Sequence, residues 1–496
     1  MKNFAFRTES SEVLLPDTEK AYDIFARLGY KIPDAIADLV DNSVDAEAAN
    51  VHIRFGRTAA GIHSVVIADD GRGMSEAELR EAMRFGSRIP RSGRQLGKYG
   101  IGLKSASLSQ ARTVTVLTRQ GRTTNGRRWT EEKAKAGWNC EILKASDVRT
   151  AFASPIGAVE TAKSGTIIIW ERLTHLQTLP ANVDTVLARA TAELQIELGI
   201  RFHRFLEKQL LTIGVDQQYG PEEPTGVCVH VTPLNPFGYE HSGHPDYPAR
   251  LRFNLEETAV VAECHIWPPQ SHALGYRLGG GKVALRQGFY FYRNNRVIQA
   301  GGWNGVRGDD GEPHLSLARV KIDLPSELDS MFKLDVTKSR LDPSPQFIST
   351  LRGVTVSNGI TFDRYLSSAE AAYRRQKKKE AAKFARVPGS GFSKKAQKAI
   401  ATILAEPGAG RPKKVAFKWA LIDPDEIVRV DAENDVLFLN SRYRPDLSEG
   451  NRNDAPVLKL ALLLLLQKEL DKSFATAKSI EWLQRVNQAL LASMKA

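Results

Sequence analysis

One segment, residues 32–46, restricts the possible folds most strongly, because it carries two opposed kinds of side chain at helical spacing. Its apolar stripe consists of Ile36, Leu39, Val40 and Val44. A second stripe carries Asp38, Asn42 and Asp45. A carboxylate and an amide oxygen one turn apart suit activation of a water molecule and binding of Mg²⁺. On the helix alone, an ordinary solvated polar face is the better explanation of the same pattern.

A second motif, ADDGRGM at residues 68–74, directly follows the strand-like run at 64–68. An Asp followed by two glycines two positions apart predicts a tight turn in which the backbone can approach a flat ligand. The carboxylate of Asp69 could accept a hydrogen bond from an exocyclic amine such as N6 of adenine. A surface Asp-Gly turn is the common alternative.

A third motif, LGKYGIGLKSAS at residues 96–107, is rich in glycine and precedes a helix predicted to begin near Leu103. Free amide groups of such a loop and the start of a helix favour a phosphate, and Lys104 could add a positive charge. The segment is neither a Walker A motif nor a dinucleotide-binding fingerprint, because it lacks the required ending and the strand–loop–helix order.

In this order and spacing, the three motifs resemble those of the GHKL ATPases, the superfamily of gyrase, HtpG, histidine kinases and MutL. The resemblance implies that Asn42 binds magnesium, that Asp69 binds adenine and that Gly73 lies beneath the base. SGTIIIWERL, residues 164–173, fits the last motif, in which Thr166 joins the water network around adenine. The other nucleotide-binding residues implied by the resemblance are Met74, Gly97, Tyr99, Gly100, Ile101, Gly102, Leu103 and Lys104.

Within that superfamily, AIADLVDNSVDA, FGSRIP and LGKYGIGLKSAS look most similar to the MORC branch, including its bacterial members. The resemblance covers residues 15–345 and extends into a second region similar to the transducer domain of gyrase, MutL and MORC. It implies that Lys338, in FKLDVTKSRLDP, reaches the terminal phosphate of ATP and acts in catalysis. A solvated loop lysine accounts for Lys338 equally well.

The chain departs from the family at Asp38, because the family usually has Glu four residues before the magnesium-binding Asn. Removing one methylene withdraws the carboxylate by about an ångström, which is enough to misplace an activated water. With Asp38 as the base, we therefore expect either slow ATP hydrolysis or a pocket remodelled to suit Asp, while ATP binding is unaffected. Asp41 is less suited as the base, since it lies off the stripe of Asn42 on a regular helix.

Composition predicts a multidomain protein that contacts an anion. The 496 residues include 69 Lys and Arg against 57 Asp and Glu, a net charge of +12. Residues 374–398 are strongly basic and hold only two aromatics, Phe384 and Phe392, which favours sequence-independent contact with duplex DNA over base stacking, although a solvated linker is the alternative. Isolated cysteines indicate a reducing, cytoplasmic location. The apolar run at 457–466 is too short to span a membrane and predicts a core helix.

We expect an α+β architecture. The resemblance implies a GHKL α/β sandwich with a mixed, mainly antiparallel sheet at 1–178, and a transducer domain at 179–345. A basic helical linker at 346–412 and a small α/β domain at 413–496 complete the chain. Within the first domain, strands are predicted at 51–55, 64–68, 113–118, 138–142 and 165–170.

The resemblance implies an ATP-gated homodimeric clamp with ATP and Mg²⁺, associated with DNA in genome maintenance or in defence against foreign DNA. Two alternatives are a weakly active nucleotide sensor that signals to a partner effector protein, and an HtpG-like chaperone, which the basic charge disfavours.

Overall fold

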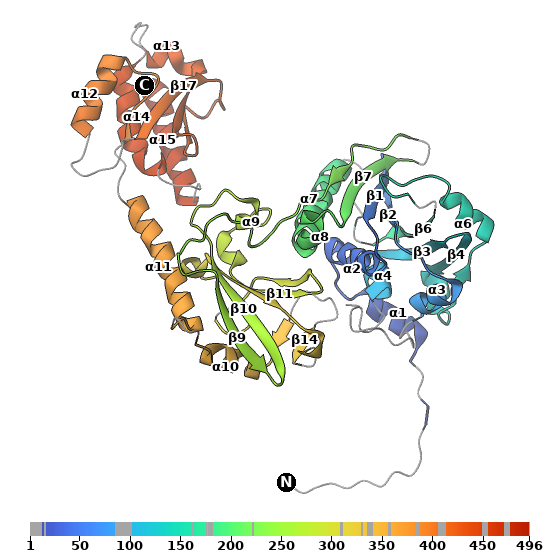
Figure 1. Ribbon diagram of the computed structural model, residues 1–496. Helices are drawn as coiled ribbons and strands as arrows, with labels where there is room; N and C mark the ends of the chain where they lie inside the picture. The colour runs from blue at the N-terminus through green and yellow to red at the C-terminus, as the bar shows by residue number, and fades with distance from the viewer. Residues whose placement is uncertain are drawn as a thin grey trace. The chain divides into compact units, whose positions relative to one another are not determined.

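The computed structural model (Figure 1) divides into two compact units, Met1–Arg374 and Arg375–Ala496, and each is described by itself. The residues described are 12–13, 16–84, 102–160, 163–174, 176, 182–220, 223–307, 311–328, 331–334, 341–355, 359–381, 386–404, 413–448, 455–470 and 477–495.

An eight-stranded sheet in the order β5-β4-β3-β6-β2-β1-β7-β8 organises the first part of unit one. Its strands are β1 (Asn50–Thr58), β2 (Gly61–Asp69), β3 (Ala111–Gln120), β4 (Thr123–Thr130), β5 (Glu141–Ile142), β6 (Ser164–Leu173), β7 (Thr212–Tyr219) and β8 (Val229–His230). Neighbouring strands are antiparallel except β1 and β7, which are parallel. The sheet is therefore mixed and mainly antiparallel, as predicted.

Helices of this region begin at local sequence signals. Asp17 caps α1 by accepting from the amide of Lys20, Pro33 lies in the first turn of α2, and Ser75 and Glu78 form a capping box on α3. The helices are α1 (Thr18–Ala26), α2 (Ile32–Asp45), α3 (Glu76–Met83), α4 (Gly102–Gln110), α5 (Glu131–Lys135), α6 (Ala145–Ala151), α7 (Val183–Arg201) and α8 (His203–Glu207).

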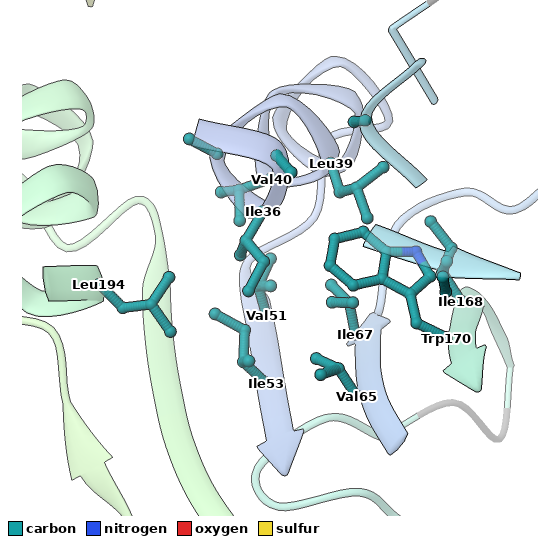
Figure 2. Close-up of a cluster of buried hydrophobic side chains, with 14 of the residues drawn as sticks. Ile36, Leu39, Val40, Val51, Ile53, Val65, Ile67, Ile168, Trp170 and Leu194 are labelled. Carbon is teal, nitrogen blue, oxygen red and sulfur yellow. The ribbon is translucent and has the colours of Figure 1, made fainter. Parts of the chain in front are cut away.

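The main core lies between α2 and the sheet, as Figure 2 shows. The apolar stripe of α2 presents Ile36, Leu39 and Val40 to side chains of β1, β2 and β6, with Leu194 of α7 beside them. The sheet contributes Val51, Ile53, Val65, Ile67, Ile168 and Trp170. Burial of this stripe sets the rotation of α2 about its axis, and this rotation decides where its polar side chains point.

A second α/β region completes unit one around a five-stranded sheet in the order β12-β11-β13-β10-β9. Its elements are β9 (Ala249–Leu255), β10 (Thr258–Ile266), α9 (Leu274–Arg277), η2 (Val283–Arg286), β11 (Gly288–Arg293), β12 (Arg296–Ala300), η3 (Pro313–Leu315), β13 (Ala318–Asp323), η4 (Ser326–Leu328), the paired β14 (Phe332–Leu334) and β15 (Leu341–Pro343), α10 (Pro345–Gly353) and the part of α11 (Phe362–Ala381) that precedes Arg375. Asn294 and Asn295, both with positive φ, turn the chain between β11 and β12.

Unit two folds around a four-stranded sheet in the order β16-β17-β19-β18. Its elements are β16 (Arg386–Pro388), α12 (Lys394–Leu404), β17 (Lys413–Ala420), β18 (Val428–Asp431), β19 (Val436–Asn440), η5 (Ser441–Tyr443), α13 (Arg444–Leu447), α14 (Pro456–Leu470) and α15 (Ala477–Lys495). The apolar run expected to be a core helix is α14, whose Leu462, Leu463 and Leu466 are buried in this unit. Among the described residues, every helix is too short or too polar to cross a membrane.

The predicted fold class is confirmed, with three differences in detail. The strand expected at 138–142 is only Glu141–Ile142, because Trp138 has a positive φ that ends α5 in a turn. The sheet of the first region continues past residue 178, since β7 pairs with β1 across a long sequence separation. The region expected to be a basic helical linker at 346–412 contains a strand, β16, which pairs with β17. The pairings of β7 with β1 and of β16 with β17 join segments far apart in the chain, and such pairings leave no periodicity in the sequence.

Candidate functional site

Three polar side chains form a row across neighbouring strands where β2 ends. In the antiparallel register, Asp69 of β2 faces Thr166 of β6, which in turn faces Thr118 of β3. Residues directly opposed on neighbouring strands lie within interaction distance of each other. Asp69 and Thr166 were singled out in the sequence, whereas Thr118 was missed because only the strand register brings it to the site.

Asp69 is held as a buried hydrogen-bond acceptor. The residue is only 6% exposed. The Gly71 amide donates to Oδ1 over 3.0 Å, and the Ser43 hydroxyl donates to Oδ2 over 3.0 Å. Burial raises the pKa of Asp69 to about 6, against the lowering effect of these hydrogen bonds. At neutral pH this carboxylate can therefore accept a further hydrogen bond from an amine such as that of adenine.

The turn after Asp69 accommodates little more than backbone. Gly73 has φ +68°, and a Cβ added there would lie 1.9 Å from the carbonyl oxygen of Arg119. The amide of Met74 then donates to Thr118 Oγ1 over 2.8 Å, which ties the turn to β3. Only glycine fits at position 73, so the space beside the Asp69 row is bounded by a fixed backbone wall.

The neighbouring Asp70 has a different role. Its Oδ1 accepts from the amides of Ala49 and Asn50, each over 2.9 Å, and its Oδ2 accepts from the Asn50 side chain. These bonds fix the start of β1 against the end of β2. Of the two consecutive acids, Asp69 faces the row of threonines and Asp70 stabilises the sheet edge.

The polar side of α2 separates into a buried part and an exposed part. Asp38 is 1% exposed, and its Oδ2 accepts from the hydroxyl of Tyr30 over 3.2 Å. Its Oδ1 lies 3.5 Å from the guanidinium of Arg201 on α7. Asn42, one turn later, is exposed. The structure therefore places the predicted base inside the domain and the predicted magnesium ligand on its surface.

Two buried arginines contact the acids of α2, and sequence reasoning identified neither. Arg201 pairs with Asp38 and, over 3.0 Å, with Glu197. Arg296, at the start of β12, pairs with Asp41 over 3.1 Å and also binds Asp45. A lone Arg in a helix or strand gives no local sign of a distant acidic partner, although the excess of acids on α2 indicates that some partner is needed.

The third motif is described only from Gly102 onward. Gly102 begins α4, Leu103 is partly buried, and Lys104 is buried with its ammonium group donating to the carbonyl of Arg84. The other predicted lid residues lie outside the described part of the chain, and these are Gly97, Tyr99, Gly100 and Ile101. Lys338 lies outside it as well.

A nucleotide fits the residues present better than a metal bound by protein ligands alone. The glycine-lined turn and the buried acceptor Asp69 suit a flat base that carries an amine. Within the described ranges there is no group of three or more His, Cys, Asp or Glu side chains placed to hold a metal ion. Mg²⁺ bound by Asn42 would therefore depend on water and phosphate oxygens for the remaining ligands.

Comparison with known families places this site in a class. Residues 30–166, which contain α2, Asp69, Gly73 and Thr166, match the family described as "Histidine kinase-, DNA gyrase B-, and HSP90-like ATPase". This part of the chain is thus a GHKL-type ATPase domain, which confirms the resemblance drawn from the three motifs.

The similar proteins include members of the MORC branch. The chain is 37% identical over 86 residues to ATPase morc-1 of Caenorhabditis elegans, covering 17% of this chain and 10% of that protein. It is 35% identical over 91 residues to human ATPase MORC2, covering 17% of this chain and 9% of that protein. It is 37% identical over 67 residues to the DNA mismatch repair protein MutL of Bacteroides fragilis, covering 14% of this chain and 10% of that protein. The matched part therefore spans about a tenth of each relative.

One solved structure, titled "Crystal Structure of N terminal domain of a DNA repair protein", covers 72% of this chain and 98% of its own at 13% identity. Its TM-score is 0.40, a likeness too loose to add to the assignment.

Proposed function

We propose that this chain is an ATPase that binds ATP beside the row formed by Asp69, Thr166 and Thr118. The buried Asp69 acceptor next to the glycine turn carries this proposal, because it joins the chemistry of adenine recognition to a wall that only backbone can form. The adenine amine would bind Asp69, and the base would lie over Gly73. The family match over residues 30–166 supports the same conclusion.

At the other end of the nucleotide, Asn42 would bind Mg²⁺, which neutralises phosphate charge when bound. Asp38 would orient the attacking water, and Lys338 would contact the terminal phosphate. Gly97, Tyr99, Gly100, Ile101 and Gly102 would close over the phosphates, and Leu103 and Lys104 would follow at the start of α4.

A DNA-associated, ATP-gated homodimeric clamp is the cellular role we propose, in genome maintenance or in defence against foreign DNA. The net charge of +12 and the basic segment 374–398 support it, since clustered Lys and Arg bind the DNA backbone without sequence preference. Similarity to MutL, named as a DNA mismatch repair protein, points the same way. These features favour the clamp over an HtpG-like chaperone.

A weakly active nucleotide sensor that signals to a partner effector is the second candidate. The observation that favours it is the state of Asp38, which is shorter than the usual Glu, is 1% exposed and contacts both Tyr30 and Arg201. Binding would then matter more than turnover.

Steady-state phosphate release, with and without long duplex DNA, separates these functions. We expect release by the unaltered chain to exceed that of an Asn42→Ala variant, and DNA to change its rate. Release no higher than that of the variant, with ATP binding retained, would support the sensor. Sedimentation with a non-hydrolysable ATP analogue tests the clamp, because monomers that persist with bound analogue contradict ATP-gated dimerisation.

A further inference from the structure

The predicted base, Asp38, is fixed by two side chains that come from outside α2. Tyr30, in the loop before the helix, donates its hydroxyl to Oδ2 over 3.2 Å. Arg201, more than 160 positions later, places its guanidinium 3.5 Å from Oδ1. Asp38 and Arg201 are 1% and 5% exposed, so little water screens the attraction between their charges.

Arg201 lies among several acids rather than in a single pair. Burial on its own would lower the pKa of its guanidinium, but the carboxylates of Glu197, Asp41 and Asp38 raise that pKa above its ordinary value. Glu197 lies one turn earlier on α7 and accepts over 3.0 Å. The guanidinium therefore stays charged and bridges α7 to the acidic side of α2.

The end of α7 that carries Arg201 is itself held in place. Two residues later, His203 Nε2 lies 2.9 Å from the hydroxyl of Tyr292 on β11. Arg204 forms a two-pronged pair with Asp323 of β13 and lies over the Tyr292 ring, 3.7 Å from its centre. Arg201 thus projects toward Asp38 from a helix end that the second sheet fixes on its other side.

We propose that Arg201 is the positioning residue for Asp38, and that it sets the direction of the short carboxylate toward the attacking water. This inference rests on the proposed ATPase function. An Asp has one fewer rotatable bond than Glu, so its oxygens stay close to the α2 backbone, and an external contact can select one rotamer. A lysine at position 201 would place its charge differently, because its ammonium is a compact group on a shorter, more flexible stem than the guanidinium that forms this 3.5 Å ion pair.

The test measures kcat, KM and affinity for a fluorescent ATP analogue in the full chain and in Arg201→Lys, Arg201→Met, Asp38→Asn and Asp38→Asn/Arg201→Met variants. We expect Arg201→Lys and Arg201→Met to lower kcat about tenfold or more, with KM and analogue affinity changed by less than about twofold. With Asp38→Asn already present, Arg201→Met should change the residual kcat by less than about twofold, because its effect acts through the carboxylate.

The matched control is Glu197→Gln, which removes the other partner of the same guanidinium and leaves the pair with Asp38. Its kcat should stay within about twofold of the unaltered chain. Circular dichroism and thermal unfolding identify variants that are not folded. If Arg201→Met is not folded, two comparisons still test the role of Arg201. Arg201→Lys is compared with the unaltered chain, and the double variant, which removes both buried charges, is compared with Asp38→Asn.

An equal loss of kcat from Arg201→Met with and without Asp38→Asn would overturn the inference, since a general structural effect is additive. An unchanged kcat in Arg201→Lys and Arg201→Met, or a loss in Glu197→Gln as large as in Arg201→Lys, would also overturn it. Failure of the underlying function looks different: the unaltered chain would then release no more phosphate than Asn42→Ala.

Discussion

The Ser43 hydroxyl donates a hydrogen bond to Asp69 Oδ2 over 3.0 Å and joins the helix α2 to the end of β2. Ser43 directly follows Asn42, so one short stretch of helix both supports Asp69 and carries the proposed magnesium ligand. Because both side chains of this bond are buried, the two ends of the proposed nucleotide site are held in a fixed relation through α2.

Asp69→Asn should raise stability while it weakens nucleotide binding. Because the pKa of Asp69 is raised to about 6 by burial, the carboxylate destabilises the folded state above that pH, by on the order of 2–3 kcal/mol. Asn can still accept from the Gly71 amide, so at pH 7.5 we expect a gain of about 1–2 kcal/mol. Urea unfolding from pH 7.5 to pH 4 measures it, and the gain should shrink as Asp69 takes up its proton.

Nucleotide binding should weaken in acid as Asp69 becomes protonated. Above pH 6 the carboxylate accepts from an amine, and below pH 6 the neutral acid predominates. Affinity should then fall roughly tenfold for each pH unit, for as long as only the carboxylate binds. Equilibrium binding of a fluorescent ATP analogue between pH 5 and 8 tests this. The residual binding of Asp69→Asn provides the control and should not show this dependence.

Gly73→Ala should disrupt the turn far more than Gly29→Ala. The two glycines have nearly the same φ, +68° and +69°, so the conformational cost of about 1 kcal/mol is shared. Only at Gly73 would the added Cβ meet backbone, at 1.9 Å from the Arg119 oxygen, whereas nothing lies within 4 Å at Gly29. We expect an extra loss of at least about 2 kcal/mol. Similar melting temperatures for the two variants would contradict the close packing of this turn.

Arg296→Met should destabilise unit one by about 3–5 kcal/mol, because it leaves the buried Asp41 without its ion pair. Adding Asp41→Asn to this variant should recover part of the loss, since the uncompensated charge is removed as well. Chemical unfolding of the two single variants and the double variant gives the coupling, expected at about 1–3 kcal/mol. Strictly additive losses would contradict a direct interaction between the two side chains.

Reversing the charges of Lys377, Lys378 and Lys379 should weaken DNA binding and flatten its dependence on salt. Each phosphate contact that is lost removes about 0.9 from the slope of log affinity against log salt concentration. Fluorescence anisotropy with a random-sequence duplex at several salt concentrations measures both quantities. Reversal at the exposed Lys20, Lys31 and Arg122 makes the same change in net charge elsewhere. If the two triple variants bind alike, the basic segment has no special role.

The sequence predicted best those features that depend on neighbouring residues. Spacing of three and four along α2 and alternation along β1, β2, β3 and β6 predicted these elements and the side that packs into the core. Glycine at position 73 was recognisable from the local turn motif, although the contact that excludes a Cβ there comes from Arg119 on the distant strand β3. The strand expected at 138–142 was wrong over most of its length, since alternation in so short a run does not detect a turn residue with positive φ.

The sequence alone was enough to predict the ATPase class, the polar and apolar stripes of α2, and Asp69 with its glycine turn. A helix repeat or a tight turn is determined within a few residues, so it can be recognised without the fold. Tertiary structure alone decided that Thr118 stands in the row with Asp69, that β7 extends the first sheet, and that Arg201 and Arg296 neutralise the acids of α2. Each of these contacts joins residues far apart in the chain, and a buried charge or strand edge specifies only the chemistry of its partner, not its position in the sequence.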